Sequence, residues 1–220
     1  LLGFGIEKIC QFRGEGLVLD REGCGHYSLQ GRKFQLEVPG VHNVYNALAA
    51  TAVGSALDVP LEDAAEALRT VRPTALRSSL IEQGGIRLYN DSYNANPAST
   101  KAAIDAAAKI EVSKGSRRLA VLGDMLELGP DEAAAHYEIG KYLASRSIDA
   151  LFALGDLSQE MVRGGIDEGL TADRCFGFTE REPLVEALRS FLKHGDLILL
   201  KGSRGLAMEE VARQLGFDVP

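Results

Sequence analysis

Tryptophan is absent from this sequence of 220 residues, and cysteine occurs only three times, at Cys10, Cys24 and Cys175. The cysteines lie far apart, are odd in number and include no C-x-x-C pair, which argues against a disulfide framework and against a zinc site. His42 has no second histidine at metal-ligand spacing. We therefore expect reduced cytosolic thiols and no metal centre.

Basic residues are fewer than acidic ones, 24 against 31, which gives a formal net charge of −7 at pH 7. A nucleic-acid backbone or an anionic membrane is therefore not a natural partner for the surface as a whole, and a small-molecule substrate fits better. No stretch approaches the roughly 20 apolar residues that cross a bilayer, and the first five residues do not resemble a signal peptide. We expect a cytoplasmic protein with no membrane insertion.

Two glycine-rich phosphate-binding patterns are also missing. No G-x-G-x-x-G follows an apolar run, so the sequence predicts no dinucleotide site of that kind. No G-x-x-x-x-G-K-[ST] occurs either. The sequence therefore lacks the loop that binds phosphates through its backbone amides, the lysine of that loop and its magnesium-binding hydroxyl. Because the sequence does not begin with methionine, we expect it to belong to a longer polypeptide with such a loop upstream.

The residues that are present are 45% hydrophobic, enough for one large domain or two modest ones with apolar cores. Residues 4–39 contain short alternating runs separated by glycines, a pattern typical of antiparallel strands and turns. Apolar residues then recur at helical spacing over residues 44–57, and a second helical stretch covers residues 60–68. The first third of the chain is thus predicted to be strand-rich and then helical.

The helical pattern ends near Pro73, and proline biases its predecessor toward extended geometry. We therefore predict two domains, residues 1–76 and 77–220. In the second, apolar strands alternate with amphipathic helices. The clearest strands are residues 86–90, 119–122, 151–154 and 197–200, and the helices lie near residues 97–110, 131–146, 157–168, 182–193 and 206–215. This alternation predicts an α/β fold, Rossmann-like in topology, with a mainly parallel sheet covered on both faces.

In open parallel sheets, ligands bind at the carboxyl ends of the strands, so the informative loops follow Asn90, Leu122 and Leu200. The loop after Asn90 reads D-S-Y-N-A-N before Pro97. Asn96 is predicted to cap the next helix, whose exposed amides could bind a carboxylate or a phosphate. A well-capped turn without a ligand is an equally good explanation of the pattern.

The other two loops are charged. Residues 123–129 read G-D-M-L-E-L-G and place two carboxylates at the sheet edge, with His136 in the helix that follows. They could orient a substrate, although an acidic turn at a helix start is also a common solvated feature. Residues 201–205 read K-G-S-R-G, where two cations and a hydroxyl between glycines suit an anion or form a solvated turn.

Asn43 and Asn46 stand at the predicted start of the first helix, just after Gly40. They are three residues apart and share one helical face, where paired amides can read the donor and acceptor edge of a purine. Capping of the helix by Asn43 alone is the simpler alternative.

Together these segments resemble the Mur ligase family. Residues 40–50, G-V-H-N-V-Y-N-A-L-A-A, are similar to its G-x-H-N-x-x-N-A-L-A-A run. The motifs at residues 91–97, 123–129 and 201–204 resemble those of the MurF type in identity, order and spacing. The resemblance covers the whole chain, from the end of a central ATP-binding domain through a carboxy-terminal domain. It implies part of an ATP-dependent ligase that adds D-Ala-D-Ala to UDP-N-acetylmuramoyl-tripeptide in peptidoglycan precursor synthesis.

The resemblance also implies roles for nucleotide-binding residues. Asn43 and Asn46 would contact the adenine of ATP, Asp91 would hold the ribose when the last domain closes, and Arg77 would help to bind the phosphates. The chain departs from the family pattern at Leu76, where glycine is usual before that arginine. It also has Asn90 where the pattern begins with a first aspartate, and we expect little consequence from that change.

In the implied reaction, ATP activates the tripeptide carboxylate as an acyl-phosphate, which the amine of D-Ala-D-Ala then attacks. Our candidates for shaping the dipeptide pocket are Tyr93, Asn94, Asn96, Lys201 and Ser203. We assign no catalytic residue and no metal ligand, because the phosphate and Mg²⁺ ligands of the family would lie mostly upstream. We expect the fragment alone to be inactive and the complete enzyme to be a monomer.

Other functions remain open from the sequence. MurE, cyanophycin synthetase and folylpolyglutamate synthase are rival amide ligases, but they are not expected to have D-S-Y-N-A-N-P after the first strand of the second domain. A non-catalytic binding module with the ligase fold is favoured by the missing phosphate loop, whereas the full set of nucleotide and acceptor motifs argues against it. A generic Rossmann-like domain would match these motifs only by accident. The third residue of the peptide substrate is not specified by this sequence.

Overall fold

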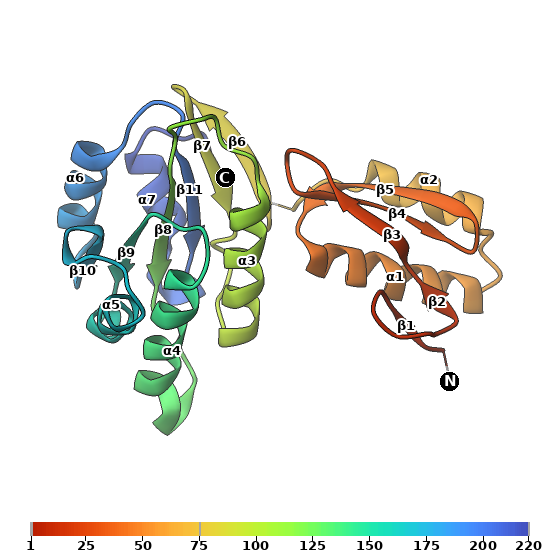
Figure 1. The fold of residues 1–220 in the computed structure, drawn as a ribbon, viewed down its shortest axis with the longest axis horizontal. Helices are drawn as coiled ribbons and strands as arrows, with labels where there is room; N and C mark the ends of the chain where they lie inside the picture. Colours follow the sequence, from red (N-terminus) through yellow and green to blue (C-terminus); the bar gives the residue numbers. More distant parts are fainter. Residues whose placement is uncertain (1, 75, 220) are drawn as a thin grey trace. The chain divides into compact units, whose positions relative to one another are not determined.

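The computed structural model describes residues 2–74 and 76–219 (Figure 1). The chain divides into two compact units, one formed by Leu1–Pro73 with Lys109–Glu111 and the other by Thr74–Ala108 with Val112–Pro220. Each unit contains its own cluster of buried hydrophobic side chains, as is usual for separately packed domains.

The first unit contains a three-stranded antiparallel sheet formed by β3 (Glu15–Leu19), β4 (Cys24–Leu29) and β5 (Arg32–Pro39). Two shorter strands, β1 (Phe4–Gly5) and β2 (Phe12–Arg13), pair with each other in parallel. The prediction of antiparallel strands is therefore correct for β3 to β5 and wrong for β1 and β2. Residues 6–11 return the chain to the start of β1, so that β2 runs in the same direction, and alternating hydrophobicity does not reveal such a return.

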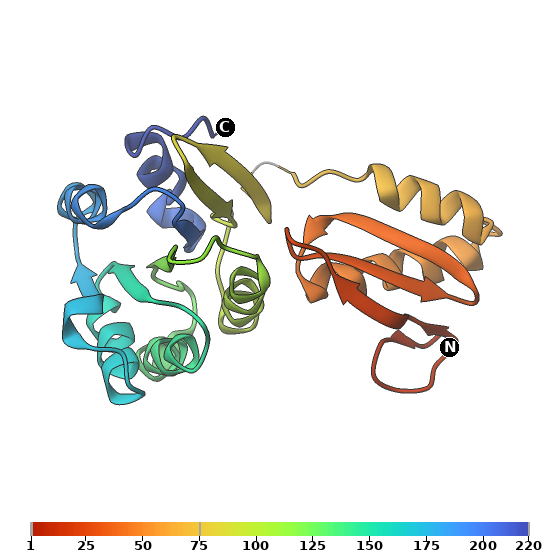
Figure 2. The same ribbon diagram turned by 45° about the horizontal axis from the view of Figure 1, so that its top comes forward.

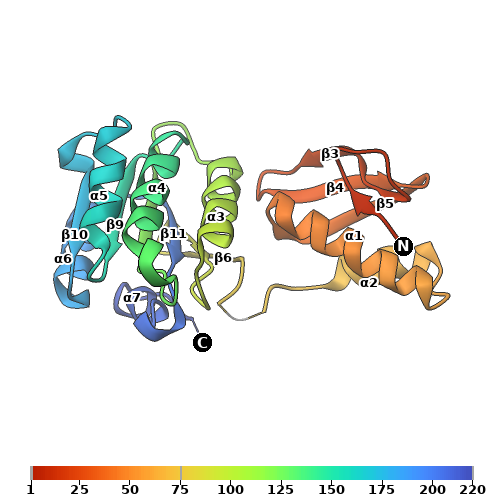
Figure 3. The ribbon, with the colours of Figure 1, turned by 90° about the horizontal axis from the view of Figure 1, so that it is seen from below.

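Two helices, α1 (Val41–Ala56) and α2 (Leu61–Thr70), cover one face of this sheet (Figure 3). Both were predicted from helical spacing. The backbone of β4 comes close to α1 at Gly25, where a Cβ would lie 2.4 Å from Val44 Cγ2. The core between sheet and helices consists of buried aromatic and aliphatic side chains that include Phe12, Tyr27, Leu29, Phe34, Leu36, Val44 and Leu48.

The second unit is built on a six-stranded sheet in the order β10-β9-β8-β11-β7-β6. Its strands are β6 (Ser79–Gln83), β7 (Ile86–Asn90), β8 (Arg118–Gly123), β9 (Ala150–Leu154), β10 (Cys175–Phe178) and β11 (Leu197–Lys201). All neighbours pair in parallel except β6, which runs antiparallel to β7 at one edge. The predicted α/β fold with a mainly parallel sheet is confirmed.

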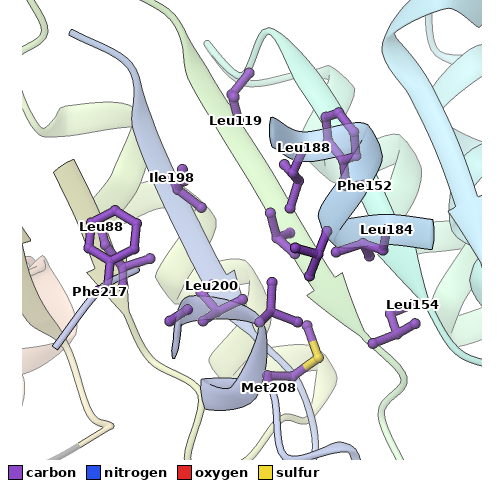
Figure 4. Close-up of a cluster of buried hydrophobic side chains, with 14 of the residues drawn as sticks. Leu88, Leu119, Phe152, Leu154, Leu184, Leu188, Ile198, Leu200, Met208 and Phe217 are labelled. Carbon is purple, nitrogen blue, oxygen red and sulfur yellow. The ribbon is translucent and has the colours of Figure 1, made fainter. Parts of the chain in front are cut away.

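Helices cover both faces of the six-stranded sheet. On one face lie α3 (Pro97–Lys109), α4 (Glu132–Ala144) and α5 (Ser158–Asp167), and on the other lie α6 (Arg181–Phe191) and α7 (Glu209–Gln214) (Figures 2 and 3). Because side chains alternate along a strand, each strand contributes to two cores. Figure 4 shows the core under α6 and α7, formed by side chains that include Leu88, Leu119, Phe152, Leu184, Leu188, Ile198, Leu200 and Met208.

The four strands predicted from apolar runs correspond to β7, β8, β9 and β11, and the five predicted helices are α3 to α7. Strands β8, β9 and β11 are buried along almost their whole length, which explains their continuous apolar sequence. β6 was not predicted, because it is an edge strand that ends in exposed polar residues. β10 was missed because it has only four residues and a glycine inside it. No helix in the described parts of the chain is long and apolar enough to cross a bilayer.

The cysteines are all free thiols. Cys24 and Cys175 are buried in β4 and β10, whereas Cys10 is partly exposed. Burial, with a smaller contribution from nearby carboxylates, raises the pKa of Cys24 to about 12 and that of Cys175 to about 11. Both buried thiols are therefore kept protonated at neutral pH.

Candidate functional site at the carboxyl edge of the sheet

Three polar loops meet at the carboxyl edge of the second unit's sheet, because β7, β11 and β8 are adjacent and parallel. Backbone hydrogen bonds join each neighbouring pair: Asp91 N donates to Leu200 O at 2.9 Å, and Ser203 N donates to Asp124 O at 3.0 Å. The loops singled out from the sequence therefore lie side by side, at the place where open parallel sheets bind their ligands.

Lys201 ends β11 and is buried, with 3% of its side chain exposed. Its Nζ donates to Asp91 Oδ2 at 2.5 Å and to Asn94 O at 2.8 Å, with a longer contact of 3.4 Å to Asp91 O. Asp91 Oδ1 accepts from Ser78 N at 3.1 Å. An ammonium group has three donors, so the loop after β7 occupies all of them.

Ser203 joins all three loops through one hydroxyl, and only 3% of the residue is exposed. Its Oγ accepts from Leu126 N at 2.8 Å and donates to Ala95 O at 3.4 Å. Since the hydroxyl is buried and bonded on both sides, it fixes the shape of the loops and is not open to solvent.

Two glycines let the loops after β8 and β11 come together. A Cβ on Gly202 would lie 3.0 Å from Gly123 Cα and 2.6 Å from Met208 Cγ. Any larger residue at position 202 would force the Met208 side chain to move and would press on the backbone at Gly123. The G-D-M and K-G-S segments therefore need glycine for packing as well as for any role in binding.

The loop after β7 has an exposed half formed by Tyr93, Asn94 and Asn96. Asn96 caps α3, as predicted: its Oδ1 accepts from Ser99 N at 2.8 Å, and Ser99 Oγ accepts from Asn96 N at 3.1 Å. This reciprocal arrangement stabilises the helix start. Of the five predicted dipeptide-site residues, these three face solvent, whereas Lys201 and Ser203 are buried next to them.

Arg77 lies beside Tyr93, with its guanidinium carbon 4.0 Å from the ring centroid. Tyr93 N also donates to Leu76 O at 3.0 Å. Leu76 and Ser78 have φ values of 64° and 49°, in the left-handed region that costs an L-residue roughly 1–2 kcal/mol. The departure from glycine at residue 76 therefore falls where the backbone itself favours glycine.

The two carboxylates of the loop after β8 differ in environment. Glu127 is exposed, whereas Asp124 is only 5% exposed. Asp124 Oδ2 accepts from Leu157 N at 3.2 Å, and Oδ1 has no hydrogen-bond partner within the described chain. Burial raises the pKa of the Asp124 carboxyl above its ordinary value, and the Leu157 amide only partly opposes this. The Asp124 side chain is thus buried inside the second unit, which the sequence pattern did not predict.

His136 is buried in α4 and organises the same loop. Its Nε2 accepts from Met125 N at 2.9 Å, and its Nδ1 lies 2.6 Å from Glu132 O. A backbone amide can only donate and a carbonyl can only accept, so these partners require the tautomer with hydrogen on Nδ1. Both ring nitrogens of His136 therefore have hydrogen-bond partners within the protein.

Asn90 and Ser92 are two fully buried polar residues that flank Asp91. Asn90 Oδ1 accepts from Ser92 N at 3.3 Å, but Asn90 Nδ2 and Ser92 Oγ have no hydrogen-bond partner within the described residues. Ser92 was not among the residues predicted for the site, and the only signal for it is a hydroxyl inside an otherwise amide-rich loop.

In the first unit, Asn43 and Asn46 lie on one face of α1. Asn46 Nδ2 donates to Asn43 Oδ1 at 3.1 Å, and Asn43 Nδ2 donates to Pro39 O at 2.8 Å. The helix is capped by Gly40, with φ 105° and no side-chain bond, so the alternative that Asn43 caps it is wrong. Asn46 is exposed, which leaves the outer part of the amide pair open to a ligand.

No group of three or more His, Cys, Asp or Glu side chains within the described residues is arranged to hold a metal ion. The polar groups in the loops at the carboxyl edge of the sheet are amides, hydroxyls, the buried Lys201–Asp91 ion pair, and the separate carboxylates of Asp124 and Glu127.

Comparison with known proteins identifies the relatives of this chain. A family model described as Mur ligase, glutamate ligase domain, matches residues 76–204. The UDP-N-acetylmuramoyl-tripeptide–D-alanyl-D-alanine ligase of Bacillus subtilis is 37% identical over 193 residues, 86% of this chain and 42% of that protein. The ligase of the same name from Treponema pallidum is 36% identical over 183 residues, 83% of this chain and 39% of that protein.

The fold agrees with these matches. MurF from Acinetobacter baumannii superposes with a TM-score of 0.85 at 25% identity, covering 97% of this chain and 46% of that structure. The chain therefore spans less than half the length of the relatives that it matches. The family model covers more than half of the chain, and on this ground the chain belongs to the Mur ligase family.

Proposed function

We propose that the full-length protein is an ATP-dependent ligase that forms a carbon–nitrogen bond between D-Ala-D-Ala and UDP-N-acetylmuramoyl-tripeptide, a step of peptidoglycan precursor synthesis. The names of the Bacillus subtilis and Treponema pallidum relatives support this proposal. Because the chain spans less than half of those proteins, the activity is proposed for the full-length protein. The part with this sequence is proposed to be inactive by itself.

The observation that carries the proposal is the meeting of the three MurF-type loops at one edge of the sheet. The exposed polar groups of the loop after β7, Tyr93, Asn94 and Asn96, stand at the amino end of α3, a helix of 13 residues. The positive end of a helix dipole favours a carboxylate, such as that of D-Ala-D-Ala. Lys201 and Ser203 are proposed to shape this dipeptide pocket from inside the fold.

In the proposed reaction, the ATP γ-phosphoryl group moves to the tripeptide carboxylate and ADP is released. The dipeptide amine then attacks the acyl carbon, the amide bond forms, the carbon–oxygen bond to phosphate breaks, and the amine loses a proton. The described residues would contribute by orienting the amine, since correct placement of two reactants removes a large part of such a barrier.

Nucleotide-binding residues are proposed in both units. Asn43 and Asn46 of the first unit would contact the adenine through their amides, and Asp91 of the second would hold the ribose with carboxylate lone pairs that Ser78 and Lys201 leave free. Arg77 is proposed to contact the phosphates. The complete enzyme is proposed to use ATP with Mg²⁺, and because the metal and phosphate ligands would lie mostly upstream, we assign none of these residues to Mg²⁺.

The proposal extends to the wider organisation of the protein. Residues 1–76 would be the end of a central ATP-binding domain, and residues 77–220 the carboxy-terminal ligase domain. The location would be the cytoplasm, in keeping with three free thiols, and the complete enzyme would be a monomer.

The test uses the full-length gene product, in which phosphate release is followed as each substrate is varied. Asn96→Asp keeps the side-chain oxygen that caps α3 but places a negative charge at the proposed carboxylate site. Asn96→Ser is the matched control, because serine is also a good cap and is neutral. We expect Asn96→Asp to raise the KM for D-Ala-D-Ala about tenfold, equivalent to about 1.4 kcal/mol, with little change in the KM for ATP.

An effect on ATP alone would count against the assigned pocket. Activity of the wild type with a different amine in place of D-Ala-D-Ala would favour another Mur-type ligase, such as one resembling MurE. No ligase activity with any such acceptor, despite nucleotide binding, would favour a non-catalytic module.

A further inference from the structure

The end of β11 presents an unusual choice of residue. Leu197, Ile198, Leu199 and Leu200 are apolar and buried, but the next residue of the strand, Lys201, carries a charge and is equally buried. Removing an ammonium group from water is costly unless it is paired and hydrogen-bonded. Packing alone would be satisfied by another aliphatic side chain, so the reason for a charge must lie in the groups that it contacts.

Those groups belong to one loop but to two different proposed functions. Lys201 Nζ contacts the Asp91 carboxylate at 2.5 Å and the Asn94 carbonyl at 2.8 Å. Asp91 is the proposed ribose ligand, and Asn94 lies in the exposed half of the loop that is proposed to meet the dipeptide. The ammonium therefore fixes the distance between the nucleotide side and the acceptor side of the same loop.

We propose that Lys201 is a positioning residue that couples the nucleotide site to the dipeptide site and touches neither ligand. This inference rests on the proposed function. Its three donors are taken by Asp91 and Asn94, so it has none left for the carboxylate of the dipeptide. It acts by holding Asp91 in the rotamer that receives the ribose and by holding the backbone of Asn94 in the shape that receives the amine.

The second oxygen of Asp91 strengthens this assignment. Asp91 Oδ1 is held by Ser78 N at 3.1 Å, while Lys201 holds Oδ2, so the carboxylate plane is fixed from two sides. The Asp91 side chain is 16% exposed, compared with 3% for Lys201. Asp91 can therefore reach a ligand, and Lys201 lies behind it.

The experiment measures the KM of all three substrates in the full-length enzyme for the wild type, Lys201→Met, Asp91→Asn and the double variant. Methionine keeps the four-atom apolar stem of lysine and lacks its ammonium group. We expect Lys201→Met to raise the KM for ATP and the KM for D-Ala-D-Ala about tenfold each, while the KM for the UDP-linked tripeptide changes less than about twofold. In the Asp91→Asn background, the further effect of Lys201→Met on ATP should fall below about threefold.

Several outcomes would overturn the coupling role. A rise in the dipeptide KM alone would make Lys201 a direct dipeptide ligand, and a rise in the ATP KM alone would confine it to the nucleotide site. An equal rise for all three substrates, or full additivity with Asp91→Asn, would reduce Lys201 to a general structural role.

Two further measurements keep the inference testable. If Lys201→Met does not fold at the assay temperature, Lys201→Gln takes its place, because its neutral amide supplies two N–H donors next to the Asn94 carbonyl and the Asp91 carboxylate. Smaller rises in the same two KM values are then expected, and unchanged values would contradict the proposal.

Hydrogen exchange of the backbone amides of residues 92–96 should become at least about tenfold faster in the Lys201 variants, and unchanged exchange would also contradict the proposal.

The exchange measurement does not depend on ligase activity, so it separates this inference from the function on which it rests. A wild-type enzyme that lacks the proposed activity would refute the proposed function. Faster exchange in its Lys201 variants would then show only that Lys201 orders the loop, and the coupling of two substrate sites would be refuted together with the function.

Discussion

The two halves of the second unit's sheet are held together in opposite ways. At the β7–β11–β8 half, the loops are joined by buried polar groups, chiefly Lys201 and Ser203. At the β9–β10 half, helices α4 and α5 meet through glycines: a Cβ on Gly140 would lie 2.0 Å from Met161 O, and a Cβ on Gly164 2.0 Å from Tyr137 O. Polar groups impose a specific geometry on loops, whereas missing side chains only allow two helices to approach. We therefore expect ligand binding to depend on the first half and stability on both.

The largest effect should come from the glycine contact. Gly164→Ala places a methyl group against the backbone of α4, which cannot yield as a side chain can, and we expect a loss of about 3 kcal/mol in the free energy of unfolding. The matched control is Gly165→Ala on the same helix, where the nearest atoms are the side-chain atoms Cys175 Sγ at 3.3 Å and Leu170 Cδ1 at 3.6 Å. Denaturant titration would compare the two.

Gly165→Ala should be close to neutral, because alanine is favoured over glycine in a helix by about 1 kcal/mol, which offsets the tighter contact. Substrate KM values in the full-length enzyme should stay unchanged for both variants. Equal destabilisation by the two substitutions would show that the backbone approach of α4 and α5 is not what holds this half together.

Ser203→Ala should have a smaller effect on stability, but it should also affect substrate binding. This change leaves the Leu126 amide without its side-chain acceptor and should cost about 1–3 kcal/mol. Because the loops lose their common hydroxyl, the KM for the dipeptide should rise more than the KM for ATP. Ser190→Ala is the control: Ser190 is exposed on α6, with its Oγ bonded to Glu186 O at 3.1 Å, and its removal should change stability by less than about 0.5 kcal/mol.

Asp124 stands where the two halves meet, since it follows β8 and accepts a hydrogen bond from Leu157 in the loop after β9. Its pKa is raised in the folded state, chiefly by burial, so the folded protein binds this proton more readily than the unfolded chain does. By linkage, the free energy of unfolding must fall as the pH rises from the ordinary value of 3.8 through the raised folded value.

Asp124→Asn removes this titration but keeps an oxygen for the Leu157 amide. We expect the variant to gain stability relative to the wild type as the pH rises above about 4, measured by denaturant titration at several pH values. A stability difference that does not change with pH would mean that Asp124 does not titrate differently on folding.

Much of the fold of the second unit can be predicted from local sequence patterns. The apolar runs of β7, β8, β9 and β11 predict strands because buried parallel strands have no polar face, and Asn96 before Pro97 predicts a helix start. β6 and β10 were missed because one is a partly exposed edge and the other is short. The parallel pairing of β1 and β2 depends on a loop whose path is not set by hydrophobic spacing.

The candidate site shows a similar limit. Sequence order placed Lys201 and Ser203 in a loop that suits an anion, but it could not show that their polar atoms are directed at Asp91, Asn94 and Leu126. Which partner satisfies a buried polar group is decided by the fold as a whole. For the same reason, the exposed Glu127 and the buried Asp124 could not be told apart from the sequence.

The unequal burial of the three cysteines should allow selective labelling of one of them for spectroscopy. At pH 7, a thiol with a pKa of about 11 is ionised in about one molecule in 10,000, and thiol reagents attack the thiolate. Cys24 and Cys175 should therefore resist labelling in the folded protein, while the partly exposed Cys10 reacts. A fluorescent or spin label could thus be attached at one native position of the first unit without first removing the other two cysteines.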